Sequence, residues 1–255
     1  MVSVTKRIKA IKQPYGGYLP IKDFNHIQLK IEDELHSEES ISPGLIGTAV
    51  DYLTRFMLGD PVEEAFRISL IGARILKKEE LIKATSLLDN IKGLDNPSII
   101  SACKLVGYDT VFRARPMTYQ PVELIAPDKA TIENIQMMVN RSIDFIENYG
   151  PVVLSGFSLD PSSITNLITS GDGDFVTEDT LWDFKVTKNR PTKNHTLQLL
   201  IYYLMCKRSI TLEEYFEPLK YLGIYNPRLQ SVYRLAISDI APEIINIVEK
   251  EVIGY

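Results

Sequence analysis

A change of apolar pattern near residue 150 constrains the fold more than any other feature of the sequence. Between residues 61 and 149, apolar side chains recur every three or four residues in stretches such as VEEAFRISLIGARILKK and TIENIQMMVNRSIDFIENY, which indicates amphipathic helices. After residue 150, the runs PVVLSGFSL, LITSGDGDFV and TLWDFKVT are separated by turn residues and indicate β-strands. A helix, a second hairpin and a terminal helix follow, so we expect one mixed sheet with helices on its faces.

The first 60 residues are expected to contribute one helix. The stretch SPGLIGTAVDYLTRFMLGD has a helix start signal at Ser42 and ends before Pro61, whereas residues 1–30 show no regular pattern. The fold class is therefore α/β with a mostly helical N-terminal half. We expect three parts in one compact domain: residues 1–60 with the first helix, the helical segment 61–149, and residues 150–255 with the sheet.

Composition excludes several classes of protein. The chain has 255 residues and a formal net charge of −5, so a site for a polyanion must be a local cluster of cations. Two cysteines, Cys103 and Cys206, are too few for an iron–sulfur cluster or a structural zinc site. The N-terminus lacks an apolar signal segment, and the apolar run LQLLIYYLMC is too short to cross a bilayer. We expect a cytoplasmic protein without membrane association.

The stretch SGDGDFVTEDTLWDFKVTK predicts a β-hairpin with acidic residues on both arms. If the turn is centred within TEDT, Asp174 lies opposite Asp183 and Asp172 lies opposite Lys185. Like charges at opposed positions destabilise a hairpin, and a divalent cation would remove that repulsion. Mg²⁺ is commonly held by one or two carboxylates together with water and phosphate oxygens. Lys185 would then be a fixed positive charge that orients a water or stabilises charge on a phosphate.

A plainer interpretation is a solvated turn. We accept it for Glu178 and Asp179, and for Asp172 it stands beside the ligand interpretation, because Lys185 would neutralise that carboxylate. It is weaker for Asp174 and Asp183, which lie among apolar strand residues. A calcium loop of the EF-hand type is excluded because its glycine position would hold a threonine.

At this point the residues resemble a known family. GDGDF followed by LWDFK resembles the two-part signature of the PD-(D/E)xK nuclease superfamily. The QLLIY stretch, with Gln198 and Tyr202, is similar to the Q-x-x-x-Y motif of its RecB-type exonuclease branch. That branch often carries a glycine and then a histidine on an upstream helix, and GTAVD offers Gly47 and, in place of the histidine, Asp51. The helical stretch between these motifs has no counterpart.

The resemblance implies a restriction-endonuclease-like mixed sheet flanked by helices, and hydrolysis of single- or double-stranded DNA with Mg²⁺ or Mn²⁺, exonuclease action being favoured. It implies that Asp174, Asp183 and the backbone carbonyl of Phe184 bind metal and that Lys185 is the catalytic lysine. Asp51 would be a further oxygen ligand suited to Mg²⁺ or Mn²⁺, or else an exposed helix residue. The iron–sulfur cluster of some members is not expected.

The helix that follows the hairpin agrees with this resemblance. Gln198 and Tyr202 would contact the nucleic-acid strand near the scissile phosphate, and together with His195 they lie on one helix face. Gln and Tyr can hydrogen-bond a phosphate or a base, and Tyr can also stack. Taken alone, Gln198 is a core-edge amide and His195 a solvated residue.

The loop KVTKNRPTKNH holds cations without one acidic residue. Lys188, Arg190 and Lys193 therefore form a candidate track for backbone phosphates, with an ordinary solvated loop as the plainer interpretation. Arg113 and Arg115 are further cations that would extend this track.

Two other functions remain open beside a metal-dependent deoxyribonuclease. The chain could be a catalytically inactive nucleic-acid-binding module of the same fold, although all three core residues are present. It could instead be a partner-docking protein that uses segment 61–149 as its surface. DNA binding that survives chelation without turnover would indicate the first alternative, and absence of both DNA and metal binding the second.

Overall fold

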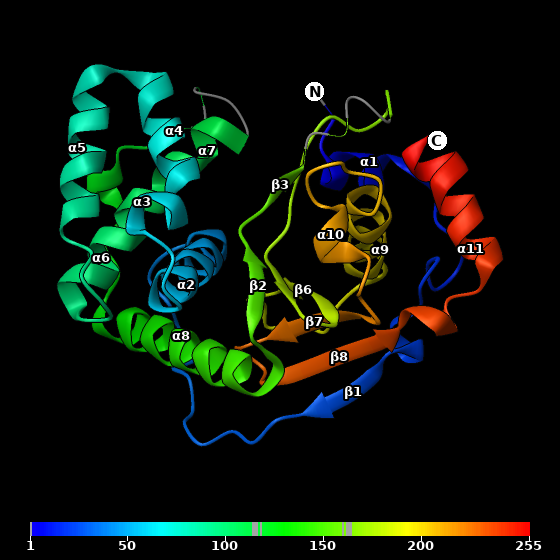
Figure 1. Ribbon diagram of the computed structural model, residues 1–255. Helices are drawn as coiled ribbons and strands as arrows, with labels where there is room; N and C mark the ends of the chain where they lie inside the picture. Colours follow the sequence, from blue (N-terminus) through cyan, green and yellow to red (C-terminus); the bar gives the residue numbers. More distant parts are fainter. Residues whose placement is uncertain (1, 114–116, 118, 160, 162–164) are drawn as a thin grey trace. The chain divides into compact units, whose positions relative to one another are not determined.

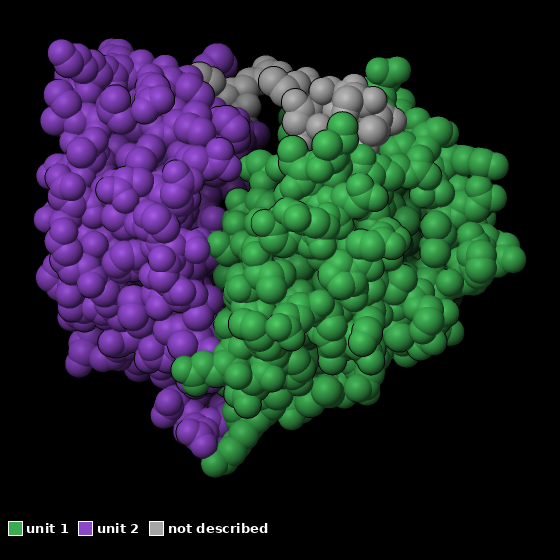
Figure 2. Space-filling view, viewed as in Figure 1, with its two compact units in different colours: residues 1–30, 146–255 green, residues 31–145 purple. Residues whose placement is uncertain are grey.

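The structure is a computed structural model that describes residues 2–113, 117, 119–159, 161 and 165–255 (Figure 1). The chain separates into two compact units, which Figure 2 distinguishes by colour. Unit 1 comprises Met1–Lys30 and Ile146–Tyr255, and unit 2 comprises Ile31–Phe145. Unit 1 is therefore assembled from both ends of the chain.

Unit 1 is built on a six-stranded sheet. In spatial order its strands are β1 (Asn25–Gln28), β8 (Ser231–Ala236), β7 (Tyr221–Asn226), β6 (Thr180–Phe184), β5 (Phe175–Thr177) and β2 (Val152–Ser155). All neighbours are antiparallel except β6 and β7, which run parallel. A separate ribbon pairs β3 (Ser158–Leu159) with β4 (Gly171–Asp172). The expected α/β class with a mixed sheet flanked by helices is confirmed.

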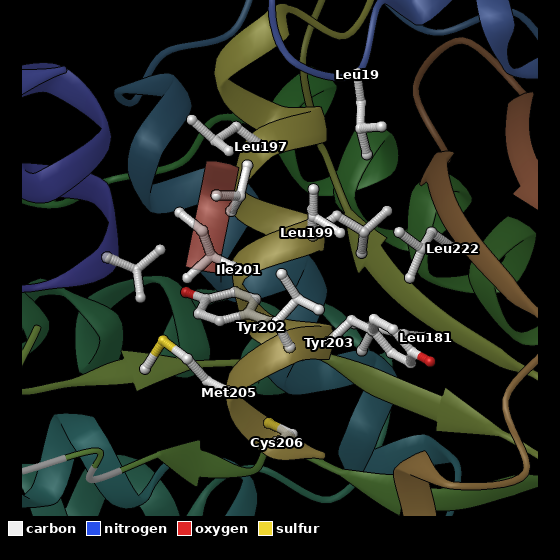
Figure 3. Packing of buried hydrophobic residues seen from close by; sticks show 14 of the residues in the cluster. Leu19, Leu181, Leu197, Leu199, Ile201, Tyr202, Tyr203, Met205, Cys206 and Leu222 are labelled. Atoms are coloured by element: carbon white, nitrogen blue, oxygen red, sulfur yellow. The ribbon is translucent and has the colours of Figure 1, made fainter. Parts of the chain in front are cut away.

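Helix α9 (Lys193–Cys206) connects the two parallel strands, because strands that run in the same direction need a crossover. Short helix α10 (Glu213–Phe216) follows it before β7 begins. Leu197 and Leu199 of α9 are fully buried in one core with Leu181 of β6 and Leu222 of β7 (Figure 3). Helix α9 thus covers one face of the sheet, which explains why its sequence is apolar on most sides.

The chain ends complete this core. Helix α1 (Val4–Ala10) and the terminal π-helix η7 (Val248–Ile253) both pack against α9. The remaining short helices of unit 1 are η1 (Ile21–Asp23), η6 (Ile237–Asp239) and α11 (Pro242–Ile247). Within the segment that we expected to be irregular, α1 and edge strand β1 are regular elements. All four side chains of β1 are exposed, so its sequence has no apolar alternation to reveal it.

Aromatic side chains line the opposite face of the sheet. Trp182 meets Tyr149 edge to face with ring centroids 5.4 Å apart, and the Phe184 ring lies 4.7 Å from that of Phe175. Gly223 of β7 lies directly against Trp182, since a Cβ at this position would be 2.3 Å from the indole ring. The alternation of β6 therefore separates an aromatic face, with Trp182 and Phe184, from the α9 face, with Leu181 and Asp183.

Unit 2 consists of helices, and its described residues contain no strand. Its α-helices are α2 (Pro43–Met57), α3 (Val62–Ala65), α4 (Arg67–Leu76), α5 (Lys78–Asp89), α6 (Asn96–Leu105), α7 (Asp109–Arg113) and α8 (Lys129–Tyr149), whose last turn belongs to unit 1. Short 3₁₀ turns are η2 (Val106–Tyr108) and η4 (Val122–Leu124). The expected helical character of segment 61–149 is confirmed for its described residues. Helix α2, which we had grouped with residues 1–60, belongs to unit 2.

Helix α2 begins where the sequence indicated. Ser42 is its N-cap, with Oγ accepting from the N–H of Leu45, and Pro43 occupies the first helical position. The helix ends at Met57, shortly before Gly59, whose φ of 109° lies in the left-handed region that favours glycine.

Among the described residues, no helix combines the length and the apolar composition that crossing a bilayer requires.

Candidate metal centre on the β5–β6 hairpin

The β5–β6 hairpin has the register expected from its sequence. Phe175 pairs with Trp182 and Val176 pairs with Leu181, as a turn centred within TEDT requires. Val176 and Leu181 both belong to the core that contains α9. The face of the hairpin that carries Val176 and Leu181 is therefore the one that packs against α9.

The two expected metal ligands both lie near α9. Asp183 follows Leu181 by two residues within β6 and therefore shares its side of the sheet. Asp174 directly precedes β5, and its charge, like that of Asp183, acts on a side chain of α9. Burial raises the pKa of the Tyr202 phenol on α9 above its usual value, and the charges of Asp183, Asp174 and Asp172 raise it further. The three carboxylates therefore act on a single side chain of the helix.

Asp174 is held by the neighbouring strand. The backbone N–H of Phe184 donates to Asp174 Oδ2 at 2.7 Å. This bond joins the arm that carries Asp174 to the arm that carries Asp183. The side chain of Phe184 lies on the aromatic face, and its carbonyl as a metal ligand stays a prediction.

Asp183 is buried and only partly satisfied. Its side chain is 5% exposed, and Lys185 Nζ donates to its Oδ1 at 2.7 Å. Within the described part of the chain, no group donates a hydrogen bond to its buried Oδ2. A buried carboxylate oxygen without a donor is unfavourable by about 1–3 kcal/mol or more. This oxygen is therefore the strongest indication that a ligand belongs here.

Asp172 is not the strand partner of Lys185 that the simple hairpin register predicted. Asp172 lies in β4 and its strand partner is Ser158 of β3, whose Oγ lies 3.2 Å from Asp172 Oδ1. The arm leaves the simple hairpin ladder at Gly173, whose N–H donates to the carbonyl of Phe157. A Cβ at Gly173 would lie 2.0 Å from the Phe157 ring, so only glycine permits this close crossing.

Gln198 and Tyr202 lie one helical turn apart on α9 and contact each other. Gln198 Nε2 donates to Tyr202 Oη at 3.2 Å. Tyr202 is 4% exposed, and its ring lies against Gly171, where a Cβ would be 2.7 Å from Cε1. The phenol is therefore a neutral group held near the aspartates.

His195 is a site residue that sequence reasoning did not select. Burial lowers its pKa, and the positive charge of Lys185 lowers it further, whereas Asp183 raises it. Its Nδ1 accepts from the N–H of Thr192 at 3.2 Å, which caps the start of α9. Its spacing from Gln198 and Tyr202 was the available signal, since all three share one helix face.

The basic loop is held open to solvent beside this site. Lys188, Arg190 and Lys193 are exposed. The base of the loop is fixed by Asn226 of β7, whose Nδ2 donates to the carbonyl of Thr187 at 2.8 Å. The loop therefore offers positive charge at the end of β6.

The remaining candidates are not among the described residues of unit 1, and their part in the site stays a prediction. Asp51 lies in α2 of unit 2, where Arg55 Nε is 3.4 Å from its Oδ1. Arg113 also belongs to unit 2 and donates to Asp109. Arg115 lies outside the described residues.

The donor set fits a small hard cation. Two carboxylates near α9, one with an unsatisfied buried oxygen, match the oxygen ligands that Mg²⁺ and Mn²⁺ prefer. Among the described residues, no group of three or more His, Cys, Asp or Glu side chains is arranged to hold a metal ion. The remaining ligands would therefore be backbone, water or phosphate oxygens.

No family model matches this chain, and neither a curated protein nor a solved structure matches it. We therefore infer the function from the residues of the site themselves.

Proposed function

We propose that unit 1 is a metal-dependent nuclease that hydrolyses DNA phosphodiester bonds, exonuclease action being favoured. The proposal depends above all on Asp183, because Lys185 holds one of its oxygens while the other is buried with no donor in the described part of the chain. A divalent cation shared with Asp174 would satisfy that oxygen and offset the repulsion between the two carboxylates.

The order of elements supports assigning the sheet to the restriction-endonuclease-like fold of the PD-(D/E)xK superfamily. Strands β5 and β6 are antiparallel, and α9 returns the chain to β7, parallel to β6. This connection brings the strand with Asp183, which Lys185 follows closely, against the helix with Gln198 and Tyr202. The stretches that resemble the RecB-type motifs are therefore close to one another within unit 1, which supports the proposal.

Each residue has a distinct part in the proposed reaction. Bound Mg²⁺ or Mn²⁺ would supply Lewis-acid stabilisation of the phosphate and favour deprotonation of a water. Asp174 and Asp183 would hold the ion. Lys185 would place a positive charge where negative charge develops on the phosphate, a contribution of the electrostatic kind that dominates phosphoryl transfer. Gln198, which is half-buried, would contact the strand at the scissile phosphate, and the buried Tyr202 would hold the Gln198 amide in place through its hydroxyl.

The exposed cations would act on the rest of the strand. Lys188, Arg190 and Lys193 would contact backbone phosphates, which fix the position of the strand without reading its sequence. In a chain of net charge −5, this local positive charge is what would attract a polyanion.

The test is digestion of linear DNA by purified protein with Mg²⁺ or Mn²⁺. We expect cleavage by the wild type, and a loss of at least about 100-fold in Asp183→Asn, because a metal ligand is removed. Glu178→Gln is the matched control, since it removes one carboxylate from an exposed position of the same hairpin. If wild type and Asp183→Asn are equally inactive under all metal conditions, the enzyme proposal fails.

The Lys185–Asp183 ion pair itself favours a second candidate, a nucleic-acid-binding module without catalysis. At 2.7 Å the lysine neutralises Asp183 with no metal bound. Such a module would bind DNA equally well with and without EDTA and would never turn it over. A metal requirement for turnover would exclude it.

A further inference from the structure

A tyrosine near the N-terminus lies wholly in solvent on a tightly built turn. Tyr15 has a relative exposure of 105%. The N–H of Gly17 donates to the carbonyl of Pro14 at 3.0 Å, closing the turn around it. Gly16 and Gly17 have φ values of 83° and 95°, which glycine adopts readily and other residues rarely do. The turn therefore keeps the Tyr15 ring in solvent, where the ring contributes no stabilisation through burial of apolar surface.

This turn is attached to the first turn of α9. Gln13 Nε2 donates to Asn194 Oδ1 at 2.7 Å. Gly17 lies so close to Lys193 that a Cβ on the glycine would be 2.6 Å from the Cβ of the lysine. Beyond the turn, Thr196 Oγ1 donates to the carbonyl of Leu19, which lies beside the N-terminal end of α9 (Figure 3). Both sides of the turn are therefore anchored to the helix.

The same end of α9 adjoins the candidate metal centre. His195 follows Asn194 directly and is near enough to Lys185 and Asp183 to feel both charges. Gln198 lies about one helical turn, roughly 5.4 Å of rise, beyond Asn194. Two exposed lysines accompany the turn: Lys12 precedes it in sequence, and Lys193 lies beside Gly17 in space. The turn that carries Tyr15, the exposed Lys193 and His195 thus lie at one end of α9, and Asp183 is near His195.

We propose that the Gln13–Gly17 turn is a stacking site in which Tyr15 packs against an unpaired nucleobase, so that the site takes a single DNA strand or an unpaired end. This inference deepens the proposed nuclease function and rests on it for the identity of the polymer. Single-strand sites combine cations that follow the backbone with aromatic rings on which bases stack. In a duplex the base faces are already stacked within the helix, so the ring would have no partner along it.

The test measures binding without cleavage, by fluorescence polarisation in EDTA. The probes are a labelled oligothymidine of about 20 nucleotides and a blunt duplex of equal length. This length is enough to cover a single-strand binding site of ordinary size. Loss of one stacked base predicts that Tyr15→Ala weakens binding of the oligothymidine about 5- to 150-fold. Tyr15→Phe keeps the ring and should bind within about 3-fold of the wild type. Binding of the duplex should be the same for all three proteins.

Ile210→Ala is the control, because Ile210 is 99% exposed and follows the opposite end of α9. If Tyr15→Ala binds the oligothymidine as tightly as the wild type, or loses no more affinity than Ile210→Ala, the inference is overturned. If that occurs while cleavage still depends on Asp183, the nuclease proposal survives alone. Binding that depends on Tyr15 in a protein that never cleaves DNA would uphold the stacking site and reject the nuclease.

Discussion

Lys185 Nζ lies 2.7 Å from Asp183 Oδ1, and the two residues are separated by one position on the α9 side of the sheet. The lysine side chain is 20% exposed and that of the aspartate 5%, so the pair is formed at the edge of the core. Lys185 therefore balances the charge of Asp183 when no cation is bound. Because the second carboxylate oxygen faces no donor among the described residues, this balance is incomplete.

Replacing Lys185 tests that role in the absence of metal. Lys185→Met removes the donor to Asp183 Oδ1, so that this oxygen as well as Oδ2 lacks the lysine's hydrogen bond and charge. We therefore expect the free energy of unfolding to fall by about 1–3 kcal/mol. Addition of Mn²⁺ should recover much of the loss, because the ion would satisfy the same oxygens. Chemical denaturation with EDTA and with Mn²⁺ measures both values. Equal stability of wild type and Lys185→Met in EDTA would contradict the expectation.

Metal binding should be visible as thermal stabilisation. A ligand that binds only the folded state raises stability by about 2.7 kcal/mol at 100 times its Kd. We expect Mn²⁺ to raise the Tm of the wild type and of Glu178→Gln, but not of Asp174→Asn or Asp183→Asn. The amide in Asp174→Asn can still accept the Phe184 N–H, so its loss of response would report charge rather than local unfolding. A full response in both aspartate variants would rule out this metal site.

His195 should make stability depend on pH. Its folded-state pKa is lowered, chiefly by burial and then by Lys185, so the neutral ring is favoured in the folded protein. Between that lowered pKa and about 6.5, the unfolded chain binds more protons than the folded protein. The free energy of unfolding therefore decreases as the pH falls through this window, and the stabilising contribution of neutral His195 is complete above it. His195→Gln should flatten this part of the curve while keeping an acceptor for the cap.

The measurement is chemical denaturation at several pH values, compared as a difference between wild type and variant. His26→Gln is the control, because His26 is exposed and stacks on Tyr233 at the sheet edge. An unchanged pH slope in His195→Gln would refute the assignment.

Gly173 should tolerate no side chain. The Cβ in Gly173→Ala would meet the Phe157 ring at 2.0 Å, so we expect a loss of about 1–3 kcal/mol in unfolding free energy as the crossing shifts. Since Asp174 is the next residue, the variant should also respond less to Mn²⁺. Gly93→Ala is the matched control, with nothing within 4 Å of the added Cβ. Equal stability of the two variants would show that the Phe157 ring does not restrict the space at residue 173.

A buried carboxylate in unit 2 gives an independent prediction. Tyr52 Oη donates to Asp109 Oδ2 at 2.6 Å, and Asp109 is 4% exposed. Tyr52→Phe leaves a buried acceptor short of one donor and should cost about 1–3 kcal/mol in stability. Tyr119→Phe should cost less, because the side chain of its acceptor Glu80 is 17% exposed against 6% for that of Asp109, so water can more readily replace the lost donor. Chemical denaturation of both variants measures which one loses more unfolding free energy.

Local features of the sequence determined the elements that short-range physics controls. The cap at Ser42 set the start of α2, and the turn within TEDT set the pairing of Phe175 with Trp182. Both depend on residues only a few positions apart, whose conformational preferences act without the rest of the chain. From α2 onward, the order of strands and helices followed from apolar periodicity for the same reason, whereas α1 and β1 were not predicted.

Only the tertiary structure decided what joins distant segments. It placed β1 beside β8, paired Asp172 with Ser158, brought His195 to Lys185, and anchored the Tyr15 turn to α9. The partners in these contacts are not neighbours in the sequence: Ser158 and Asp172 are 14 positions apart, and Gln13 and Asn194 are 181 apart. Their pairing is selected by which packing buries the most apolar surface and satisfies the most polar groups. The sequence thus determined which residues form the hairpin and its carboxylates, whereas long-range packing decided which oxygen stays unsatisfied and what surrounds it.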